Sequence, residues 1–418
     1  MRILITGAGI GGLTAALACL QRGLDVDVYE QAPAIAEVGA GVQISANGSR
    51  VLFALGLETA LQKCWVEPTG KEIRLWNTGQ TWKLFDLGSV SRARYGAPYF
   101  MIHRADLHRA LSDAVRTIKP NAVHLNSRYI GFEQDNLSVK AHFSEGQSQR
   151  GDVLIGADGV HSRIRDQLIG VDRPHFTGCV AWRGLVPAER LPAKYLRPVG
   201  VNWIGRGGHI VTYPIRRREI LNFVGIVERS NWQVESWTKK GTHEECEADF
   251  NAWHGEIHEI VRNIETPHKW ALLGREPLAR WSFGRVTLLG DAAHPTLPML
   301  AQGANMAIED GMVLSRCLLE CDNIVSGLQL YDEIRRTRAN KLVRGALDNA
   351  NRFHNPILAD TVGAQHYVDT EWREDNVKQR YDWIFEYDAL TAGAISSVSS
   401  VSSVSAVSVA NERACTKE

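Results

Sequence analysis

The chain has 418 residues, 44% hydrophobic and 22% charged, which is the composition of a globular protein long enough to bury a large core. Its 47 Lys and Arg residues balance its 47 Asp and Glu residues, so it lacks the basic field of proteins that bind nucleic acid or anionic membranes. No apolar run approaches the ~20 residues of a membrane span, and the first strand begins too early for a signal peptide. We therefore expect a cytoplasmic protein without nucleic-acid or membrane partners.

The first predicted elements surround the glycine-rich stretch GAGIGG at residues 7–12. Before it, RILIT at residues 2–6 is a short apolar run typical of a strand buried on both faces. After it, leucines recur at helical spacing over residues 13–20, and LDVDVYE at residues 24–30 alternates as a strand does. Strand, glycine turn, helix and strand within about thirty residues predict a βαβ unit.

The glycines fit the pattern G-x-G-x-x-G at Gly7, Gly9 and Gly12. In this pattern the first glycine permits the tight turn, the second lets backbone approach a pyrophosphate, and the third lets helix pack closely on strand. Glu30 ends the second strand, where an acid is expected to bind a ribose hydroxyl. The sequence therefore predicts a dinucleotide site, although a tight turn without a ligand is the alternative, and the loop alone does not distinguish NAD from FAD.

The middle of the chain interrupts this α/β pattern with strand-like segments at residues 179–186, 208–215 and 220–227. The last two are joined by a short charged turn, which indicates a hairpin in an antiparallel sheet. A buried strand returns within residues 284–294, followed by a helix over residues 304–322. We expect one α/β domain built from separate segments, with an antiparallel sheet inserted. None of the seven cysteines forms a CxxC pair, and no metal site is predicted.

Two later stretches give the glycine loop its context. LIGADGVHSRIR at residues 154–165 and LLGDAAHPTLPMLAQGANMAIEDG at residues 288–311 resemble, in order and spacing, the second and third motifs of the group A flavoprotein hydroxylases. The resemblance runs from residue 1 to about residue 390 and is strongest to the single-component hydroxylases of salicylate, hydroxybenzoate and hydroxynicotinate. It implies FAD as the cofactor, NAD(P)H and O₂ as co-substrates with NADH preferred, and allows a homodimer.

The same resemblance implies a Rossmann-like FAD domain of the para-hydroxybenzoate hydroxylase type and a β-sheet substrate domain. The FAD domain takes residues 1–72, 97–175 and 272–350, and the substrate domain takes residues 73–96 and 176–271. A C-terminal helical segment follows at residues 351–390. Residues 391–418 begin with a low-complexity Ser/Val run and are predicted to be a disordered tail without chemistry.

By this resemblance, the three motifs and one helix start hold FAD. The implied FAD-binding residues are Gly7, Gly9, Ile10, Gly11, Gly12, Glu30, Arg104, Asp158, Gly159, Asp291, Gly303, Ala304 and Asn305. Arg104 matches the family arginine near the pyrophosphate and ribityl chain, and a salt bridge at a helix start is its alternative. His294 borders the flavin loop, either as a second polar contact or as a residue that caps the loop.

The chemistry implied by the resemblance runs through a C4a-hydroperoxyflavin, whose distal oxygen is attacked by an electron-rich ring. A phenolate attacks better than a phenol, and since a phenol has a pKa near ~10, a base should help at neutral pH. His209 and Tyr213 are four apart in a predicted strand and so share one face. Related enzymes place a His and a Tyr at matching positions, so we expect His209 to be the base and Tyr213 to orient the substrate. A hydrogen-bonded histidine of the sheet is the alternative.

The substrate is less well determined. Gln43 should lie near the ring edge, where a related hydroxynicotinate enzyme carries a histidine, and Pro298 stands where the 3-hydroxybenzoate 6-hydroxylase pattern has a glutamine. Both departures leave decarboxylation of salicylate to catechol as the main prediction, with 3-hydroxybenzoate 6-hydroxylation and 6-hydroxynicotinate 3-hydroxylation as alternatives. Arg183 and Arg206 are candidates for binding the carboxylate. From other classes, an FAD oxidase or dehydrogenase and a non-catalytic flavin-binding regulator stay open.

Overall fold

The computed structural model describes residues 1–35, 39–229 and 239–393. Its first sheet has six strands in the order β17-β18-β11-β1-β2-β7, and every neighbouring pair is parallel except β17 with β18. The strands are β1 (Arg2–Thr6), β2 (Asp25–Tyr29), β7 (Val123–His124), β11 (Val153–Gly156), β17 (Ser282–Phe283) and β18 (Val286–Leu288). The strands of the predicted βαβ unit, β1 and β2, and the predicted strand within residues 284–294, β18, therefore belong to one sheet.

Helix α1 (Ile10–Leu20) packs against this sheet and against α5 (Arg104–Ile118) and α9 (Gly303–Glu320). Almost every residue of α1 is buried, which accounts for its mixture of leucine and alanine without charge. A Cβ on Gly311 of α9 would lie 2.7 Å from the backbone nitrogen of Ala15. Glycine thus lets α9 approach α1 closely enough to bring the α9 N-terminus to the edge of the sheet.

The second sheet has seven strands in the order β16-β12-β15-β14-β13-β4-β5, antiparallel except between β13 and β4. The strands are β4 (Gly70–Leu75), β5 (Thr81–Asp86), β12 (His175–Pro187), β13 (Val199–Gly205), β14 (Gly208–Ile215), β15 (Ile220–Glu228) and β16 (His268–Gly274). The predicted hairpin is confirmed, since Ile215 pairs with Ile220 across the turn. The sheet begins at Gly70, not at residue 73, because β4 pairs with β13 along its whole length.

The structure also contains two small sheets and several short helices. A three-stranded sheet contains β8 (Tyr129–Gln134), β9 (Val139–Phe143) and β10 (Ser148–Gly151), and a two-stranded sheet contains β3 (Gly41–Ile44) and β6 (Phe100–His103). The shorter helices are α2 (Ala46–Ala54), α3 (Glu58–Gln62), α4 (Gly88–Tyr95), α6 (Arg163–Ile169), α7 (His243–Asp249) and α8 (Gly255–Arg262). Strand β6 also contacts β14 of the seven-stranded sheet and α5, and β3 contacts α9.

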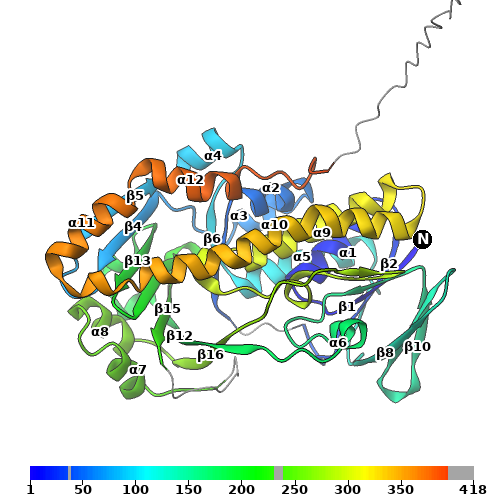
Figure 1. Ribbon diagram of the computed structural model, residues 1–418, viewed down its shortest axis with the longest axis horizontal. Helices are drawn as coiled ribbons and strands as arrows, with labels where there is room; N and C mark the ends of the chain where they lie inside the picture. Colours follow the sequence, from blue (N-terminus) through cyan, green and yellow to red (C-terminus); the bar gives the residue numbers. More distant parts are fainter. Residues whose placement is uncertain (36–38, 230–238, 394–418) are drawn as a thin grey trace, which may run out of the picture.

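The C-terminal helices span both parts of the molecule. Figure 1 shows α10 (Ile324–Phe353) running along the molecule from the six-stranded sheet to the seven-stranded sheet, with α11 (Thr361–Glu371) and α12 (Glu374–Phe385) returning beside it. The predicted α/β fold with an inserted antiparallel sheet is confirmed. Most of the predicted tail, from residue 394 onward, lies outside the described residues.

Candidate active site

The glycine-rich loop between β1 and α1 is packed against the ends of two neighbouring strands. A Cβ on Gly7 would lie 2.3 Å from the carbonyl oxygen of Ala157, just after β11, and Gly7 has a φ of +95°. A Cβ on Gly11 would lie 2.7 Å from Cδ2 of Leu289, just after β18. A larger residue at either position would displace its neighbour. Three motifs that are far apart in sequence therefore lie together at the carboxyl ends of β1, β11 and β18.

Gly9 differs from these glycines because no atom of the described residues lies within 4 Å of the position that its Cβ would take. Gly9 is the N-cap of α1, and no side chain caps the helix there. The N–H groups at Ile10, Gly11 and Gly12 thus form a helix N-terminus that an external acceptor can approach. A bare backbone at the positive end of a buried helix fits a pyrophosphate.

Glu30 lies beside this loop at the end of β2. Its carboxylate accepts hydrogen bonds from the N–H of Ala8 at 2.8 Å and from the N–H of Ala32 at 2.9 Å. These bonds fix the carboxylate, and each oxygen keeps a lone pair for a ribose hydroxyl. The open Gly9 backbone and the fixed Glu30 carboxylate therefore fit the ADP half of FAD.

Asp158 organises the second motif through its own loop. One carboxylate oxygen accepts from the Ser162 hydroxyl at 2.5 Å, and the other accepts from the N–H of Arg163 at 2.9 Å, so Asp158 holds the start of α6. Burial raises the pKa of Asp158, and these hydrogen bonds oppose the rise. The next residue, Gly159, has a φ of +78°, and a Cβ there would have no atom of the described residues within 4 Å. The backbone at Gly159 is thus left open.

Asp291 lies in a short turn directly after the six-stranded sheet, and its side chain is exposed. The carbonyl of the next residue, Ala292, accepts a hydrogen bond at 3.3 Å from the buried guanidinium of Arg165 in α6. Arg165 therefore ties the second motif to the third. The Asp291 carboxylate stays accessible, as a carboxylate that binds a ribityl chain requires.

Helix α9 begins at Gly303, and Gly303 and Ala304 keep part of their surface accessible, whereas Asn305 is buried. The Asn305 amide is used within the protein. Its Nδ2 donates to the carbonyl of Gln43 at 3.1 Å, and its Oδ1 accepts from the N–H of Ser45 at 3.1 Å. Asn305 thus holds the helix start against β3, and within the described structure the Gln302 side chain at the N-cap does not cap this positive helix end.

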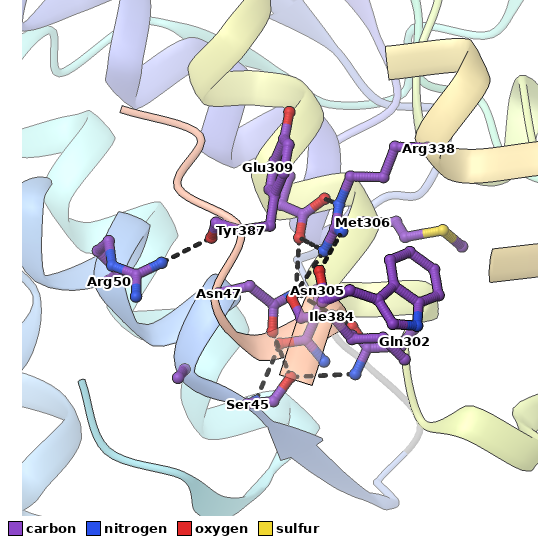
Figure 2. Close-up of polar contacts among 12 residues, drawn as sticks. Ser45, Asn47, Arg50, Gln302, Asn305, Met306, Glu309, Arg338, Ile384 and Tyr387 are labelled. Carbon is purple, nitrogen blue, oxygen red and sulfur yellow. Dashed lines mark hydrogen bonds and ion pairs between the residues drawn. The ribbon is translucent and has the colours of Figure 1, made fainter. Parts of the chain in front are cut away.

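Figure 2 shows the buried polar network that holds this helix start. Asn47 Nδ2 donates to Glu309 at 2.5 Å and to Gln302 at 3.1 Å, and Gln302 donates to the Ser45 hydroxyl at 3.0 Å. Arg338 of α10 binds both carboxylate oxygens of Glu309, at 2.8 and 2.9 Å. Although burial raises the pKa of Glu309, Arg338 brings it below its usual range. The flavin loop is therefore anchored on α10 by a buried ion pair.

His294 has a structural partner in the next part of α9. Its Nε2 lies 2.5 Å from a carboxylate oxygen of Asp310, and Asp310 also accepts from Arg335 at 2.7 Å. Burial raises the pKa of Asp310, but His294 and Arg335 lower it to about 2. Of the two roles considered for His294, this geometry favours holding the loop. Pro298, on the same loop, is exposed at the start of a short 3₁₀ turn.

On the seven-stranded sheet, Tyr213 lies where β14 meets the β3–β6 sheet. A Cβ on Gly41 would lie 2.6 Å from the Tyr213 ring and 2.7 Å from Cγ of Asn222. The Tyr99 hydroxyl donates to Gln43 Oε1 at 2.5 Å. Burial raises the pKa of Tyr213, and a hydrogen bond with Gln43 opposes the rise. The structure thus brings Gln43 and Tyr213 together, as the sequence predicts, and adds Tyr99 and Asn222.

His209 lies on the same face of β14, about 13 Å from Tyr213 along the strand, with the partly accessible Val211 between them. Its Nδ1 lies 2.7 Å from Nε2 of His354, and its ring centroid lies 5.0 Å from that of Phe353. Burial lowers the pKa of His209 well below its usual range, and His354 lowers it further. His209 is therefore neutral at physiological pH.

Lys71 is a site residue that sequence reasoning missed. Its Nζ lies 5.1 Å from the Tyr99 ring centroid, and its side chain passes beside Gly200 of the neighbouring strand. No carboxylate of the described residues pairs with this ammonium group, and burial lowers its pKa to about 8. In the same corner, Nδ2 of Asn222 is buried without an acceptor in the described structure. Two donors near Tyr213 thus lack an anion.

Of the two arginines predicted to bind a carboxylate, Arg183 lies on the same sheet face as Tyr213, because Arg183 pairs with Val224 and Val224 pairs with Val211. Arg183 is buried on β12, 5.6 Å from the Trp270 ring centroid, and burial together with the charge of Arg104 lowers its pKa. Arg104 begins α5, and its role at the cofactor stays a prediction. Arg206 is exposed in the turn between β13 and β14. Lys71 supplies positive charge to the corner around Tyr213.

Two histidines near Arg104 form hydrogen bonds with the protein backbone. His103 caps α5 by accepting from the N–H of Ala105 at 3.2 Å, and His108 bonds to the carbonyl of Ala8 at 2.6 Å.

Across residues 1–35, 39–229 and 239–393, no group of three His, Cys, Asp or Glu residues could hold a metal ion. Within the same ranges, none of the helices has the length and apolar character needed to cross a membrane.

Comparisons with known proteins agree with this geometry. A family described as FAD binding domain matches residues 1–346. The 3-amino-4-hydroxybenzoate 2-monooxygenase PtmB3 of Streptomyces platensis is 37% identical over 94% of this chain and 98% of its own length. The 6-hydroxynicotinate 3-monooxygenase of Pseudomonas fluorescens is 36% identical over 83% of this chain and 91% of its own. The crystal structure of Klebsiella pneumoniae HpxO complexed with FAD and uric acid superposes with a TM-score of 0.81 at 26% identity, over 92% of this chain and 97% of that one.

Proposed function

This chain belongs to the FAD-dependent aromatic monooxygenases, and we propose that its substrate is a small aromatic carboxylic acid that carries a hydroxyl group. NAD(P)H as electron donor and O₂ as co-substrate belong to the same proposal. The observation that carries it is one sheet face with a neutral histidine, His209, at one end and an unpaired ammonium, Lys71, beside Tyr213 at the other. The two ends suit the two polar groups of such an acid.

FAD would be held by the open backbone at Gly9, the Glu30 carboxylate, the Asp158 and Asp291 loops and the N-terminus of α9. When bound, FAD supplies the activation of O₂ with electrons from the pyridine nucleotide. The protein's own residues bind the aromatic ring, orient it, exclude water and set the protonation state of its hydroxyl.

His209 is the residue proposed to take the hydroxyl proton. Its Nδ1 is engaged by His354, and no residue of the described chain hydrogen-bonds to Nε2. A neutral imidazole with one nitrogen bonded offers the lone pair of the other. Removing the proton makes the ring electron-rich, which matters because a phenol with a pKa near ~10 is otherwise protonated at neutral pH.

Lys71 is the residue proposed to bind the carboxylate, in place of Arg183 and Arg206. A half-buried ammonium without a partner among the described residues is unfavourable, and a carboxylate would give it a charge-assisted hydrogen bond. Nδ2 of Asn222 is a second donor for the same anion. Tyr213 and Gln43 would then orient the acid between Lys71 and the flavin loop.

The relatives support the alternatives in the substrate prediction more than salicylate. Two of them are named for a hydroxylated benzoate and for hydroxynicotinate, at 37% and 36% identity over most of this chain. We therefore rank 3-amino-4-hydroxybenzoate, 3-hydroxybenzoate and 6-hydroxynicotinate ahead of salicylate. Membership of the monooxygenases also replaces the oxidase and regulator alternatives.

A binding titration with a matched ligand pair tests this proposal. We would add 3-hydroxybenzoate or 3-hydroxybenzamide to the FAD-loaded protein and follow the perturbation of the flavin absorbance. The proposal predicts that the wild-type protein binds the acid far more tightly than the amide and that Lys71→Met loses most of this preference. Equal binding of acid and amide by the wild-type protein would contradict it.

A further inference from the structure

We propose that His209, His354 and Glu228 form a proton relay that carries the substrate's hydroxyl proton from the buried sheet face to solvent. The inference rests on the proposed role of His209 as the base and goes beyond it, because it assigns a function to two residues outside the substrate face. His354 and Glu228 would be positioning residues that act through His209.

The relay is a continuous chain of hydrogen bonds across three elements. Nδ1 of His209 in β14 lies 2.7 Å from Nε2 of His354, which is the C-cap of α10. Nδ1 of His354 lies 2.9 Å from a carboxylate oxygen of Glu228, the last residue of β15. Both distances are those of direct hydrogen bonds, so no bridging water is required.

The order of the three groups sets the tautomer of each ring. A carboxylate only accepts, so Glu228 requires the N–H of His354 to be on Nδ1. Nε2 of His354 is then an acceptor, which requires the N–H of His209 to be on Nδ1. The remaining lone pair, on Nε2 of His209, is the one that a base needs.

The outer end of the relay reaches water. The Glu228 side chain is 58% exposed, whereas that of His354 is 3% exposed. Both residues line a cavity of about 410 Å³, together with Cys179, Arg229, Leu297 and Met299. A proton that reaches Glu228 therefore meets solvent without crossing the protein core.

The backbone holds the relay in place. The N–H of Gly207 donates to the carbonyl of His354 at 3.2 Å, and the N–H of Glu228 donates to the carbonyl of Gly207 at 2.8 Å. The Phe353 ring, which precedes His354, packs against His209 and against Trp372. These contacts fix the end of α10 to β14 and β15, so the rings do not depend on their own hydrogen bonds for position.

The electrostatic surroundings explain why a relay is needed. Burial and the neighbouring His354 lower the pKa of His209, so a proton left on that ring would be unstable. Burial also lowers the pKa of His354, while the hydrogen bond to Glu228 raises it. The other titratable groups at the cavity are Cys179 and Arg229, and Arg229 is paired with Asp249 at 2.7 Å. Glu228 is thus the anion that draws the proton outward.

The transfer balances in protons. The substrate hydroxyl gives its proton to Nε2 of His209, and the Nδ1 proton of His209 passes to Nε2 of His354. The Nδ1 proton of His354 passes to Glu228, which releases it to water. The net change is one phenolate formed in the site and one proton delivered to solvent, with all three residues neutral or anionic as before once their tautomers are restored.

The test uses Glu228→Gln and His354→Gln, with His209→Asn as the reference and Glu219→Gln as the control. Glu219 is an exposed glutamate at the other end of the β14–β15 hairpin. The probe is 3-amino-4-hydroxybenzoate bound to the FAD-loaded proteins. After a rapid upward pH jump, its ultraviolet difference spectrum reports the rate at which the bound phenol ionises, and flavin content and thermal unfolding check that each variant is folded.

We expect Glu228→Gln and His354→Gln to slow ionisation of the bound phenol by about 10²-fold, while Glu219→Gln matches the wild-type rate. Wild-type ionisation rates in both relay variants, with a large loss in His209→Asn, would overturn the relay but keep His209 as the base. A wild-type ionisation rate in His209→Asn would overturn both. Glu228→Gln changes only an exposed side chain, so its result stands even if His354→Gln unfolds.

Discussion

Gly7 and Ala157 are in such close contact that a Cβ on Gly7 would lie 2.3 Å from the Ala157 carbonyl oxygen. Two residues later in the loop, Gly9 has no such neighbour in the described protein. The same motif therefore contains one glycine required by the fold and one left open for a ligand. This contrast separates folding from cofactor binding in a way that experiment can follow.

We predict that Gly7→Ala and Gly9→Ala fail differently. Gly7→Ala must push β1 and β11 apart and hold alanine at a positive φ, so the apoprotein should lose about 1–3 kcal/mol of stability. Gly9→Ala has an ordinary φ of −72° and open space, so the apoprotein should unfold like the wild type while FAD affinity falls. Thermal unfolding of the apoproteins and FAD titration measure both effects. Equal unfolding temperatures for the two variants would contradict the distinction.

His209→Asn should remove the base without removing the site. We expect hydroxylation at neutral pH to fall by about 10²–10⁴-fold and to recover as the pH approaches the pKa of the substrate phenol. Flavin content and the rate of flavin reduction by NADH should stay near wild type. The measurement is the pH dependence of kcat for hydroxylated product. A variant profile parallel to that of the wild type would rule out His209 as the base.

Lys71→Met should change how stability depends on pH. The Lys71 pKa is about 8 in the folded protein and ~10.4 in the unfolded chain. Between these values the unfolded chain binds more protons, so wild-type stability rises with pH relative to Lys71→Met, and below pH 8 the half-buried charge destabilises the wild type. Unfolding temperatures of both proteins at pH 7 and pH 9.5 test this.

The same comparison with 3-hydroxybenzoate present tests the carboxylate partner. The acid should raise the unfolding temperature of the wild type at pH 7 much more than that of Lys71→Met, because only the wild type gains an ion pair. The difference should shrink at pH 9.5, where the Lys71 ammonium loses its proton. An equal rise in both proteins at pH 7 would show that Lys71 does not meet the carboxylate.

Arg338→Met should destabilise the flavin loop and the fold together. It removes two hydrogen bonds from the buried Glu309 carboxylate, which keeps its ion pair with Arg335 at 2.6 Å, and a hydrogen bond to a charged group contributes about 1.5–3 kcal/mol. Arg336→Met is the control on the same helix, since the Arg336 side chain is 31% exposed, and its partner Asp332 keeps hydrogen bonds from the N–H groups of Trp281 and Ser282. The loss there should be smaller. Urea unfolding of both variants gives the comparison. Similar losses in the two would mean that the buried network does not anchor the loop.

Acid should weaken the same anchor. The pKa values of Glu309 and Asp310 lie below their usual range, with that of Asp310 at about 2. Their stabilisation is full above a pH of ~4 and is lost as the pH falls toward 2. Release of FAD should therefore accompany acid unfolding in that window, which flavin fluorescence can follow.

The sequence was informative where chemistry follows a local pattern. The glycine spacing, the alternation of β2 and the charged turn at residues 216–219 each predicted an element that the structure contains. Family motifs placed Asp158 and Asp291 on loops that Arg165 now joins. Local patterns suffice there because the loops that follow neighbouring parallel strands all lie at the carboxyl ends of those strands.

Lys71 and His354 had no comparable signal. The sequence around Lys71 gives no local sign of a ligand site. The parallel pairing of β4 with β13 is what brings Lys71 beside Gly200 and toward Tyr99. His354 lies 145 residues from His209 in the chain and reaches it only because α10 is thirty residues long. The beginning of the seven-stranded sheet at Gly70 has the same origin. Such pairings depend on tertiary structure, which one sequence does not specify locally.

The most direct test of the central claim is turnover with product analysis. We would follow NADH oxidation, peroxide and aromatic product with 3-amino-4-hydroxybenzoate, 3-hydroxybenzoate, 6-hydroxynicotinate and salicylate in parallel. The account predicts that at least one of these acids yields a hydroxylated product in step with NADH consumed, and that His209→Asn loses the product while keeping NADH oxidation. Peroxide alone with every acid, and no oxygenated product, would contradict the proposal that this monooxygenase acts on a hydroxylated aromatic acid.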